Sequence, residues 1–455
     1  MELLPRLTAR CVASAVRLSG AGQASSMPGK VANRLFPGYL AGHARRLTDG
    51  LAIVTGTNGK TTTANMAAGA LADAGRDFVH NSEGANLLSG IATAFSRRPA
   101  ARFALLEIDE AIVPAAVERL GAPRVVVLMN LFRDQLDRYG ELDTLAAKMK
   151  KAIVTLDPSR TVALNADDPL VASIGSGLEQ KVLYYGIDDQ KYASDTMQHA
   201  ADSKHCAACG GRLDYDYYLF GHLGRYRCPD CGASRPETDV AATHIEMLGM
   251  EGTRCTLRFP GGTCDLTIPV PGLYNVYNIL AAMTASLALG VEPDAVLGAV
   301  EDFTAAFGRV ERVQAGNRDI MMILAKNPAG FNEVIRTLTF APGKKTVMLA
   351  LNDNIADGRD VSWIWDVDFE MFRGRLADVV CSGVRAFDMA LRIKYAGVGE
   401  MSLAEEPDLA KALDAGLIAA GRAGTLYVVP TYTAMLDLRK TMVERGLVTP
   451  YWEDN

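Results

Sequence analysis

A strand, a glycine-rich turn and a helix follow one another in the segment LAIVTGTNGKTTTANMAAGALADAG, which begins at Leu51. This succession constrains the fold more than any other feature of the chain. Glycine lets the backbone approach an anion closely, and the N–H groups at a helix N-terminus then point toward that anion. The segment therefore predicts a phosphate-binding loop between a buried strand and a helix. The usual spacing of such loops is G-x-x-x-x-G-K-S/T, and the glycines here lie closer together.

The residues of this loop have distinct expected roles. Lys60 would offset the charge of the β- and γ-phosphates, and the Thr61 hydroxyl would ligate Mg²⁺. The alternative is a glycine-rich turn that only precedes a helix, and the Gly-Lys-Thr-Thr run argues against it. We expect the phosphates of a nucleotide to be bound by Gly56, Thr57, Asn58, Gly59, Lys60, Thr61 and Thr62.

Short apolar runs alternate with helical stretches from Leu51 to about Ile187. Runs such as RFALLEID, RVVVLMN and RTVALNADD predict an α/β fold, with a parallel sheet covered by helices on both faces. A polar, Tyr-rich insertion follows, and a third unit with the strands KTVMLALND, ADVVCSGV and GTLYVVPTY starts near Val313. We predict an N-terminal segment at 1–50, a central domain at 51–312 with the insertion at about 188–240, and a Rossmann-like α/β domain at 313–455.

The N-terminal segment is basic, because Glu2 is the only acid among its first 40 residues. We interpret it as a basic helix packed on the central domain; a transit peptide and an amphipathic membrane-surface helix are the alternatives. The whole chain has a net charge of −6, which argues against general nucleic-acid binding. No apolar run approaches the roughly 20 residues of a transmembrane helix.

Four of the eight cysteines stand in the insertion as C-x₂-C, 18 further residues and C-x₂-C. A glycine follows the second cysteine of each pair, as in a zinc ribbon, so Cys206, Cys209, Cys228 and Cys231 are predicted to bind a structural Zn²⁺. DNA binding by such a ribbon is a weaker alternative in an acidic chain. The remaining cysteines are scattered and favour buried thiols in a reducing cytosol; they are Cys11, Cys255, Cys264 and Cys381.

Several segments resemble, in chain order, the Mur ligase superfamily, which includes folylpolyglutamate synthase. They are TGTNGKTT, MNLFRDQLDRYG, LNADDP, PGLYNVYNILAA and FGRVERV. The resemblance implies that ATP phosphorylates a carboxylate and that an amine attacks the acyl phosphate. It also implies that Asn275 and Asn278 flank the adenine, that Arg309 contacts the γ-phosphate and that Asp168 lies near the nucleotide. The alternative for the two asparagines is a helix cap and a surface position.

Acidic residues end the strand RFALLEID at the edge where ligands bind. Glu107 is expected to be catalytic as a second Mg²⁺ ligand, and Asp109 and Glu110 are weaker candidates; a solvated strand-end acid is the alternative. The sequence departs from the superfamily at Gln135, which replaces a metal-binding His. Lys148 is the nearest match to a carbamylated lysine of the superfamily.

Two last-domain segments, LAKNPAGFNE and LNDNIADGRDVSWIWDVDFE, do not resemble an amino-acid pocket. Together with the cysteine insertion and HNSEGAN, they resemble the MurT-type subunits of lipid II isoglutaminyl synthase, which pair with a GatD-type glutaminase. That resemblance implies cytoplasmic amidation, at the inner membrane face, of the D-glutamate α-carboxylate of lipid II to D-isoglutamine. The cofactors it implies are ATP, Mg²⁺ and Zn²⁺.

The glutaminase is expected on a separate chain, because Cys381 in VVCSGV lacks the first glycine of a G-x-C-x-G elbow. By resemblance, Asp360 would act catalytically by orienting the partner's His, with Asp353 and Asp357 as alternatives. Asp366 and Asp368 complete the acidic group, and Lys326 would contact phosphate or the substrate carboxylate.

Two other functions stay open. One is an amino-acid-adding Mur ligase or folylpolyglutamate synthase, which Gln135 and the acidic last-domain segment argue against. The other is a non-catalytic nucleotide-binding scaffold, which Glu107, Arg309 and the NVYN run argue against.

Overall fold

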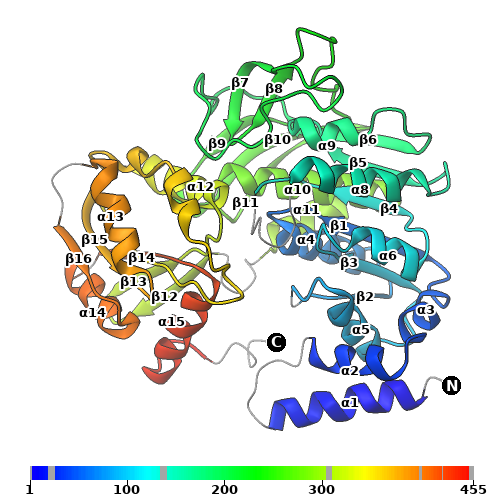
Figure 1. Cartoon of the computed structure of the whole chain (residues 1–455), viewed down its shortest axis with the longest axis horizontal. Coiled ribbons are helices and arrows are strands. Elements are labelled where there is room, and N and C mark those ends of the chain that lie inside the picture. The colour runs from blue at the N-terminus through cyan, green and yellow to red at the C-terminus, as the bar shows by residue number, and fades with distance from the viewer. Residues whose placement is uncertain are drawn as a thin grey trace.

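The computed structural model describes residues 3–18, 26–82, 84–133, 141–303, 310–398, 402–422 and 424–449. Two α/β units, each built on its own sheet, lie side by side (Figure 1). The first sheet has nine strands in the order β11-β10-β9-β6-β5-β4-β1-β3-β2. They are β1 (Gly50–Thr55), β2 (Phe78–His80), β3 (Phe103–Glu107), β4 (Val125–Leu128), β5 (Thr161–Asn165), β6 (Lys181–Ile187), β9 (Val240–Met247), β10 (Thr253–Phe259) and β11 (Gly262–Ile268).

The strand β1 lies between β3 and β4 and pairs with both in parallel. Successive side chains of a strand point to opposite faces of its sheet. Accordingly, Ala52 and Val54 pack in one core and Leu51 and Ile53 in another. The first face is covered by the helices α4 (Lys60–Asp73), α10 (Leu273–Ala288) and α11 (Pro293–Glu301). The second face is covered by α5 (Leu88–Arg97), α6 (Val113–Leu120), α8 (Leu142–Val154) and α9 (Pro169–Ile174). The predicted parallel sheet with helices on both faces is confirmed.

An antiparallel extension closes one end of this sheet. The strand β6 pairs with β9 in parallel, whereas β9 pairs with β10 and β10 with β11 in antiparallel fashion. The insertion that precedes β9 carries a separate two-stranded ribbon, β7 (Asp214–Phe220) and β8 (Leu223–Arg227).

Three N-terminal helices pack on the second face: α1 (Leu3–Leu18), α2 (Met27–Leu35) and α3 (Tyr39–Ala44). Gly29 permits close contact between α2 and α5, because a Cβ there would lie 1.9 Å from the carbonyl oxygen of Ser89. The Gly29 amide donates to the Thr93 hydroxyl at 2.9 Å. Among the described residues, no helix is long and apolar enough to cross a membrane.

The second sheet has six strands in the order β12-β13-β17-β14-β15-β16, and only β12 pairs with its neighbour in antiparallel fashion. The strands are β12 (Glu311–Ala315), β13 (Arg318–Met322), β14 (Lys345–Ala350), β15 (Leu376–Ser382), β16 (Ser402–Glu405) and β17 (Thr425–Pro430). One face is covered by α12 (Pro328–Phe340) and α13 (Ala386–Ala396), and the other by α14 (Leu409–Ala419) and α15 (Tyr432–Glu444). Short 3₁₀ helices occur at Gly249–Glu251, Ser362–Asp366 and Phe369–Phe372.

Candidate active site

The glycine-rich loop joins β1 to α4, and both of its glycines are required by their surroundings. Gly56 and Gly59 have φ angles of 139° and 86°, which L side chains rarely adopt. A Cβ on Gly56 would lie 3.0 Å from the backbone of Asn130, and one on Gly59 would lie 2.1 Å from Oδ1 of Asn278. The loop is therefore packed tightly between the end of β4 and helix α10.

Asn130, which sequence reasoning gave no role, holds the loop in place. Its carbonyl oxygen accepts from the Thr57 amide at 3.0 Å, and its Oδ1 accepts from the Asn58 amide at 2.9 Å. Its Nδ2 donates in turn to the carbonyl oxygen of Asn58 at 3.0 Å. Asn130 follows the apolar run RVVVLM at a strand end, and this position is the sequence feature that could have indicated a role at the site.

Lys60 begins α4 and is buried under the loop. Its ammonium donates to the carbonyl oxygens of Gly56 and Thr57 and to the Glu110 carboxylate at 3.0 Å. Burial alone would lower the pKa of Lys60, but the carboxylates of Glu110, Glu107 and Asp109 outweigh it and raise that pKa. The lysine is therefore charged, and its closest counter-charge is Glu110, which sequence reasoning had ranked below Glu107.

Glu107 differs from Glu110 in having an oxygen without a partner. It ends β3, is 2% exposed, and its backbone is bracketed by hydrogen bonds with the side chain of Asn81. Its Oε1 accepts from Asn86 at 3.4 Å, while its Oε2 is buried and has no hydrogen-bond partner among the described residues. A buried carboxylate oxygen without a hydrogen bond is rare, and a hard cation such as Mg²⁺ would satisfy it. Glu107 is not the solvated acid of the alternative interpretation.

Lys326 brings a second cation to this group from the other sheet. It lies half-buried immediately before α12. Burial would raise the pKa of Glu110, but Lys60 and then Lys326 outweigh it and lower that pKa. The next residue, Asn327, caps α12 through the Gly330 amide and donates to Oδ1 of Asn58 at 3.0 Å. The second unit thus contacts the phosphate loop directly.

Asn275 and Asn278 lie together on the first turns of α10. Both are buried, which excludes the surface alternative, and Nδ2 of Asn278 donates to Oδ1 of Asn275 at 2.9 Å. They line a narrow cavity between α10, α12 and the loop. Its wall also includes Asn58, Gly59, Thr62, Phe220, Val270, Tyr274, Leu324, Glu333 and Val334.

Asp168 holds the segment that follows Asn130. It is fully buried, and its Oδ1 accepts from the amides of Leu170 and Val171 to cap α9. Its Oδ2 accepts from the Leu131 amide at 2.9 Å and lies 3.3 Å from Nε2 of the buried His222. The carboxylate therefore fixes the segment beside Asn130, and a place for Asp168 near the nucleotide stays a prediction.

The described structure leaves three other expected residues untested. Arg309 and Gln135 lie outside the described residues. Lys148 is exposed on α8, and its carbamylation stays a prediction.

The four cysteines of the insertion come together at one point. Their Sγ atoms all lie within 4.8 Å of one another, with Cys206 to Cys231 at 3.6 Å and Cys209 to Cys228 at 3.5 Å. A tetrahedral Zn²⁺ with Zn–S bonds of about 2.3 Å requires sulfur atoms about 3.8 Å apart. Gly210 and Gly232 have φ angles of 76° and 77°, and each turns the chain back toward its cysteine pair. The cluster fits a metal ion.

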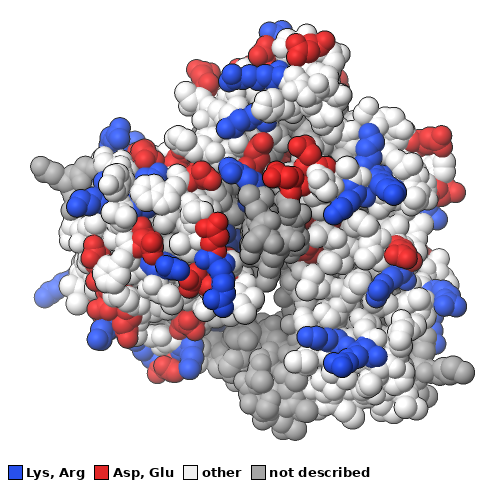
Figure 2. Space-filling view, viewed as in Figure 1, with Lys and Arg blue, Asp and Glu red and all other residues white. Residues whose placement is uncertain are grey.

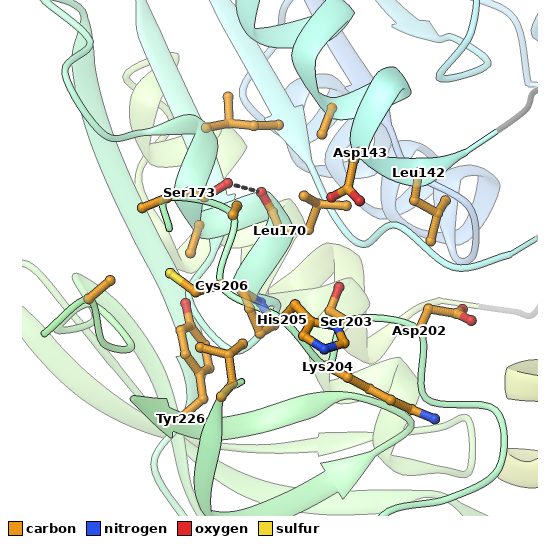
Figure 3. A pocket seen from close by; sticks show the side chains of 18 of the residues that line it. Leu142, Asp143, Leu170, Ser173, Asp202, Ser203, Lys204, His205, Cys206 and Tyr226 are labelled. Carbon is orange, nitrogen blue, oxygen red and sulfur yellow. Dashed lines mark hydrogen bonds between the residues drawn. The ribbon is translucent and has the colours of Figure 1, made fainter. Parts of the chain in front are cut away.

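A cavity of about 1000 Å³ is lined by residues of this ribbon and of α8 and α9 (Figure 3). Asp143 and Leu142 lie on its α8 side, and Ser203, Lys204 and His205 on its ribbon side. Arg133 borders it and pairs with Asp202. The preceding residue, Phe132, accepts and donates hydrogen bonds at the hydroxyl of Thr57 in the phosphate loop.

The five aspartates after β14 divide into three groups. Asp357 is buried and accepts from the amide and hydroxyl of Thr433, and Asp353 pairs with Arg385 at 2.8 Å. Asp366 and Asp368 instead face the first unit, where they contact Arg133 and His199. Asp360 is exposed, and the hydrogen bonds from Ser362 lower its pKa. Of the five, Asp360 is the one that forms no ion pair or hydrogen bond with a distant element among the described residues.

An apolar face lies along α13. Phe387, Leu391 and Tyr395 recur at helical spacing and are exposed, Phe387 by 63% and Tyr395 by 71%. Trp365, from the 3₁₀ helix that follows Asp360, stacks edge-on to Tyr395 with ring centroids 5.7 Å apart. The docking face, as we define it, comprises Asp360, Trp365, Phe387, Leu391 and Tyr395. Burial raises the pKa of the nearby Cys381 thiol to about 12, so this cysteine is not a nucleophile.

Comparison with known proteins gives matches over most of the chain. The family described as Mur ligase middle domain matches residues 54–224, and that described as MurT ligase C-terminal matches residues 324–435. The lipid II isoglutaminyl synthase (glutamine-hydrolyzing) subunit MurT of Streptococcus pneumoniae is 33% identical over 95% of both chains.

Two solved structures share the fold. A pseudomurein peptide ligase type C from Methanothermus fervidus has a TM-score of 0.67 and 21% identity, covering 87% of this chain and 79% of its own. The MurF ligase of Thermotoga maritima in complex with ADP has a TM-score of 0.63 and 15% identity, covering 89% and 84%.

Proposed function

Because the chain belongs to the MurT family of Mur ligase-like synthase subunits, we propose that it amidates the D-glutamate α-carboxylate of the lipid II peptide stem. ATP supplies the driving force and ammonia the nitrogen, and the product is D-isoglutamine. The observation that supports a ligase best is the group formed by Lys60, Glu107 and Glu110 at the end of β3, beside the glycine-rich loop.

The reaction begins with ATP on the loop. The amides of the loop and of the first turn of α4 face the phosphates, and Lys60 exchanges its loop carbonyl partners for phosphate oxygens. Thr61 and Glu107 would hold Mg²⁺, which offsets the repulsion between the γ-phosphate and the incoming carboxylate. Glu110 stays beside Lys60 and keeps it charged in the interval between turnovers.

Two displacements then follow. The α-carboxylate attacks the γ-phosphorus, the bond to the ADP oxygen breaks, and an acyl phosphate forms. Ammonia attacks the acyl carbon, inorganic phosphate leaves, and a proton is lost from the nitrogen. Lys326, which already acts on Glu110 across the gap between the two units, is positioned to neutralise the acyl phosphate. No side-chain pocket for an amino acid is required by this chemistry.

We propose that a glutaminase of the GatD type supplies the ammonia from the docking face. The described residues contain no accessible nucleophilic cysteine in an elbow, since Cys381 is buried. Exposed aromatic side chains grouped on one helix are typical of a protein–protein contact. Asp360 lies at the margin of this face with an oxygen available to accept a hydrogen bond from a partner's histidine.

The acceptor is a lipid, and the N-terminal helices suit a membrane surface on the cytoplasmic side. Residues 3–48 contain no acid, and their basic residues are Arg6, Arg10, Arg17, Lys30, Arg34, Arg45 and Arg46. Figure 2 shows basic side chains over this part of the molecule. Leu4 and Leu7 are exposed on α1, and Asn33 of α2 donates to the carbonyl oxygen of Leu88, two residues from Asn86 at the active site. Anionic lipids attract such a basic, apolar surface.

Zinc in the four-cysteine cluster would be structural. Four thiolates complete its coordination, which leaves no open position for a substrate. The metal would hold the ribbon, whose apolar side chains form only a small cluster with Ala172 of α9. The ribbon in turn contacts the first sheet through Arg235, which pairs with the buried Asp167.

The function is tested with the purified chain, ATP, Mg²⁺ and lipid II, with ammonium as the nitrogen source. We expect a product in which an amino group replaces one hydroxyl group of the stem, together with ADP. Product formation that requires an added amino acid instead of ammonium would contradict the proposal and favour an amino-acid-adding ligase.

A further inference from the structure

Glu333 is a buried carboxylate that the reaction above does not use. It lies on the second turn of α12 and is 2% exposed, and neither of its oxygens has a hydrogen-bond partner among the described residues. The nearest cation is Arg336, whose Nη1 is 3.6 Å from Oε1. That guanidinium already donates to the carbonyl oxygens of Leu219 and Tyr192. An ionisable group left in this state costs stability, so a binding role is the natural reason for it.

The surroundings of Glu333 indicate what it would bind. It lines the same cavity as Asn275, Asn278 and Gly59, on the opposite wall. Most of the remaining wall is apolar or aromatic, as suits the faces of a flat base. The hydrogen bond from Asn327 to Asn58 fixes the start of α12 against the loop. A nucleotide with its phosphates on the loop would therefore place its base between α10 and the first turns of α12.

We propose that Glu333 hydrogen-bonds the exocyclic amino group of the adenine base and is thereby a specificity-determining residue for the nucleotide. This inference rests on the proposed function in so far as ATP is the nucleotide. It adds a contact from the second unit to a base that the asparagines of α10 flank from the first. Glu333 would then contact the base directly when the two units close on ATP.

The chemistry of the group suits adenine. Burial raises the pKa of Glu333 to about 7, although Arg336 acts in the opposite direction. In its neutral form, the carboxyl group accepts through its carbonyl oxygen and donates through its hydroxyl. The Watson–Crick edge of adenine offers the complementary pair, a donor at N6 and an acceptor at N1. A glutamine side chain has the same shape and the same donor–acceptor pair as the neutral carboxyl group.

Equilibrium binding of ATP and of purine riboside triphosphate, which lacks only the amino group, tests the proposal by calorimetry on the full chain. We expect the unmodified chain to bind ATP about 10- to 100-fold more tightly than the analogue, the range of one hydrogen bond to a buried polar group. Glu333→Ala should bind the two equally, and Glu333→Gln should restore the preference. Glu292→Gln, at the exposed N-cap of α11, is the matched control and should leave the preference unchanged.

Two results would overturn the proposal. One is an undiminished preference for ATP in Glu333→Ala. The other is a loss of affinity in Glu333→Ala that disappears when 2′-deoxy-ATP or 3′-deoxy-ATP replaces ATP, which would assign the contact to the ribose. Because binding is measured without lipid II, a failure of the amidation assay would be a separate outcome. A thermal melt of each variant confirms that it is folded.

Discussion

The carboxylate of Glu107 accepts one hydrogen bond, from Asn86 at 3.4 Å, and its other oxygen is buried with no hydrogen-bond partner among the described residues. The side chain of Asn81 hydrogen-bonds both the amide and the carbonyl oxygen of Glu107, so the backbone that carries the unpaired oxygen is fixed. It is this asymmetry that distinguishes Glu107 from Glu110, whose carboxylate neutralises Lys60.

Glu107→Gln should weaken the use of Mg²⁺ more than it weakens the binding of the acceptor. The amide keeps the shape of the side chain but loses the anionic oxygen that a hard cation prefers. We expect the Mg²⁺ concentration for half-maximal activity to rise about 10- to 100-fold, the range found for altered metal surroundings. Glu118→Gln, on the exposed side of α6, is the control. An unchanged Mg²⁺ dependence in Glu107→Gln would remove this residue from the metal site.

A charge placed on the docking face should lower the rate of amidation with glutamine but not with ammonium. We expect Phe387→Glu and Tyr395→Glu to reduce glutamine-driven amidation at least about tenfold, because a buried unpaired charge at an interface is costly. Ammonium-driven amidation should be unchanged. Ile418→Glu is the matched control, since Ile418 is 73% exposed on α14, on the opposite face of the same sheet. Equal loss with both nitrogen sources would show that the variants damage the ligase itself.

Asp360→Asn tests the role of that residue apart from docking. The substitution keeps the hydrogen bond with Ser362 within reach but removes the charge. Binding of the glutaminase should persist while glutamine hydrolysis falls, because an amide does not stabilise an imidazolium. Pull-down and glutaminase assays on the same complex measure the two effects. Unchanged hydrolysis would exclude Asp360 and direct attention to Asp353, which Arg385 now engages.

Removal of the metal should unfold the ribbon and leave the first sheet folded. We expect the purified chain to carry one zinc ion, and Cys209→Ser or a strong chelator to release it. Limited proteolysis should then cut within residues 188–240. Cys264→Ser alters a half-buried cysteine of β11 outside the cluster and should retain the zinc. A chain free of zinc with an unaltered cleavage pattern would contradict the assignment.

The buried Glu333 should make stability depend on pH in an unusual direction. Its pKa rises on folding from 4.5 to about 7, so the folded state binds more protons than the unfolded state between these values. The free energy of unfolding should therefore fall as pH rises from about 4.5 to 7, by up to about 3 kcal/mol. Glu333→Gln should abolish that contribution and be more stable than the parent at pH 8. Denaturant unfolding at several pH values measures it, and a destabilised Glu333→Gln would indicate a structural role with Arg336.

The sequence predicted those parts of the fold that depend on local pattern. Apolar runs predicted β1, β3, β4 and β5, because strands buried on both faces leave a continuous apolar signal. The family matches confirm the Mur ligase-like centre and the MurT-type last domain. The antiparallel strands β9 to β11 were not foreseen, since they follow a polar insertion and are only partly buried.

In the candidate site, too, the sequence predicted the parts that depend on local pattern and missed those that depend on contacts between elements. The loop and the pair Asn275 and Asn278 are short motifs on one element, and they lie together as expected. Asn130, Asn81 and Glu333 were missed, because their roles depend on which elements the fold brings side by side. The motif predicted Asp168 near the nucleotide, which stays a prediction, and the structure shows that its buried carboxylate holds the backbone that supports the loop.

The most direct test of the account follows an oxygen atom. Lipid II labelled with ¹⁸O in the D-glutamate α-carboxylate is incubated with the chain, ATP, Mg²⁺ and ammonium, and the released phosphate is analysed by mass spectrometry. If the carboxylate attacks the γ-phosphorus, one labelled oxygen is transferred to inorganic phosphate for each amide formed. Amide formation with unlabelled phosphate would contradict the acyl phosphate route and, with it, the roles assigned here to Lys60, Glu107 and Lys326.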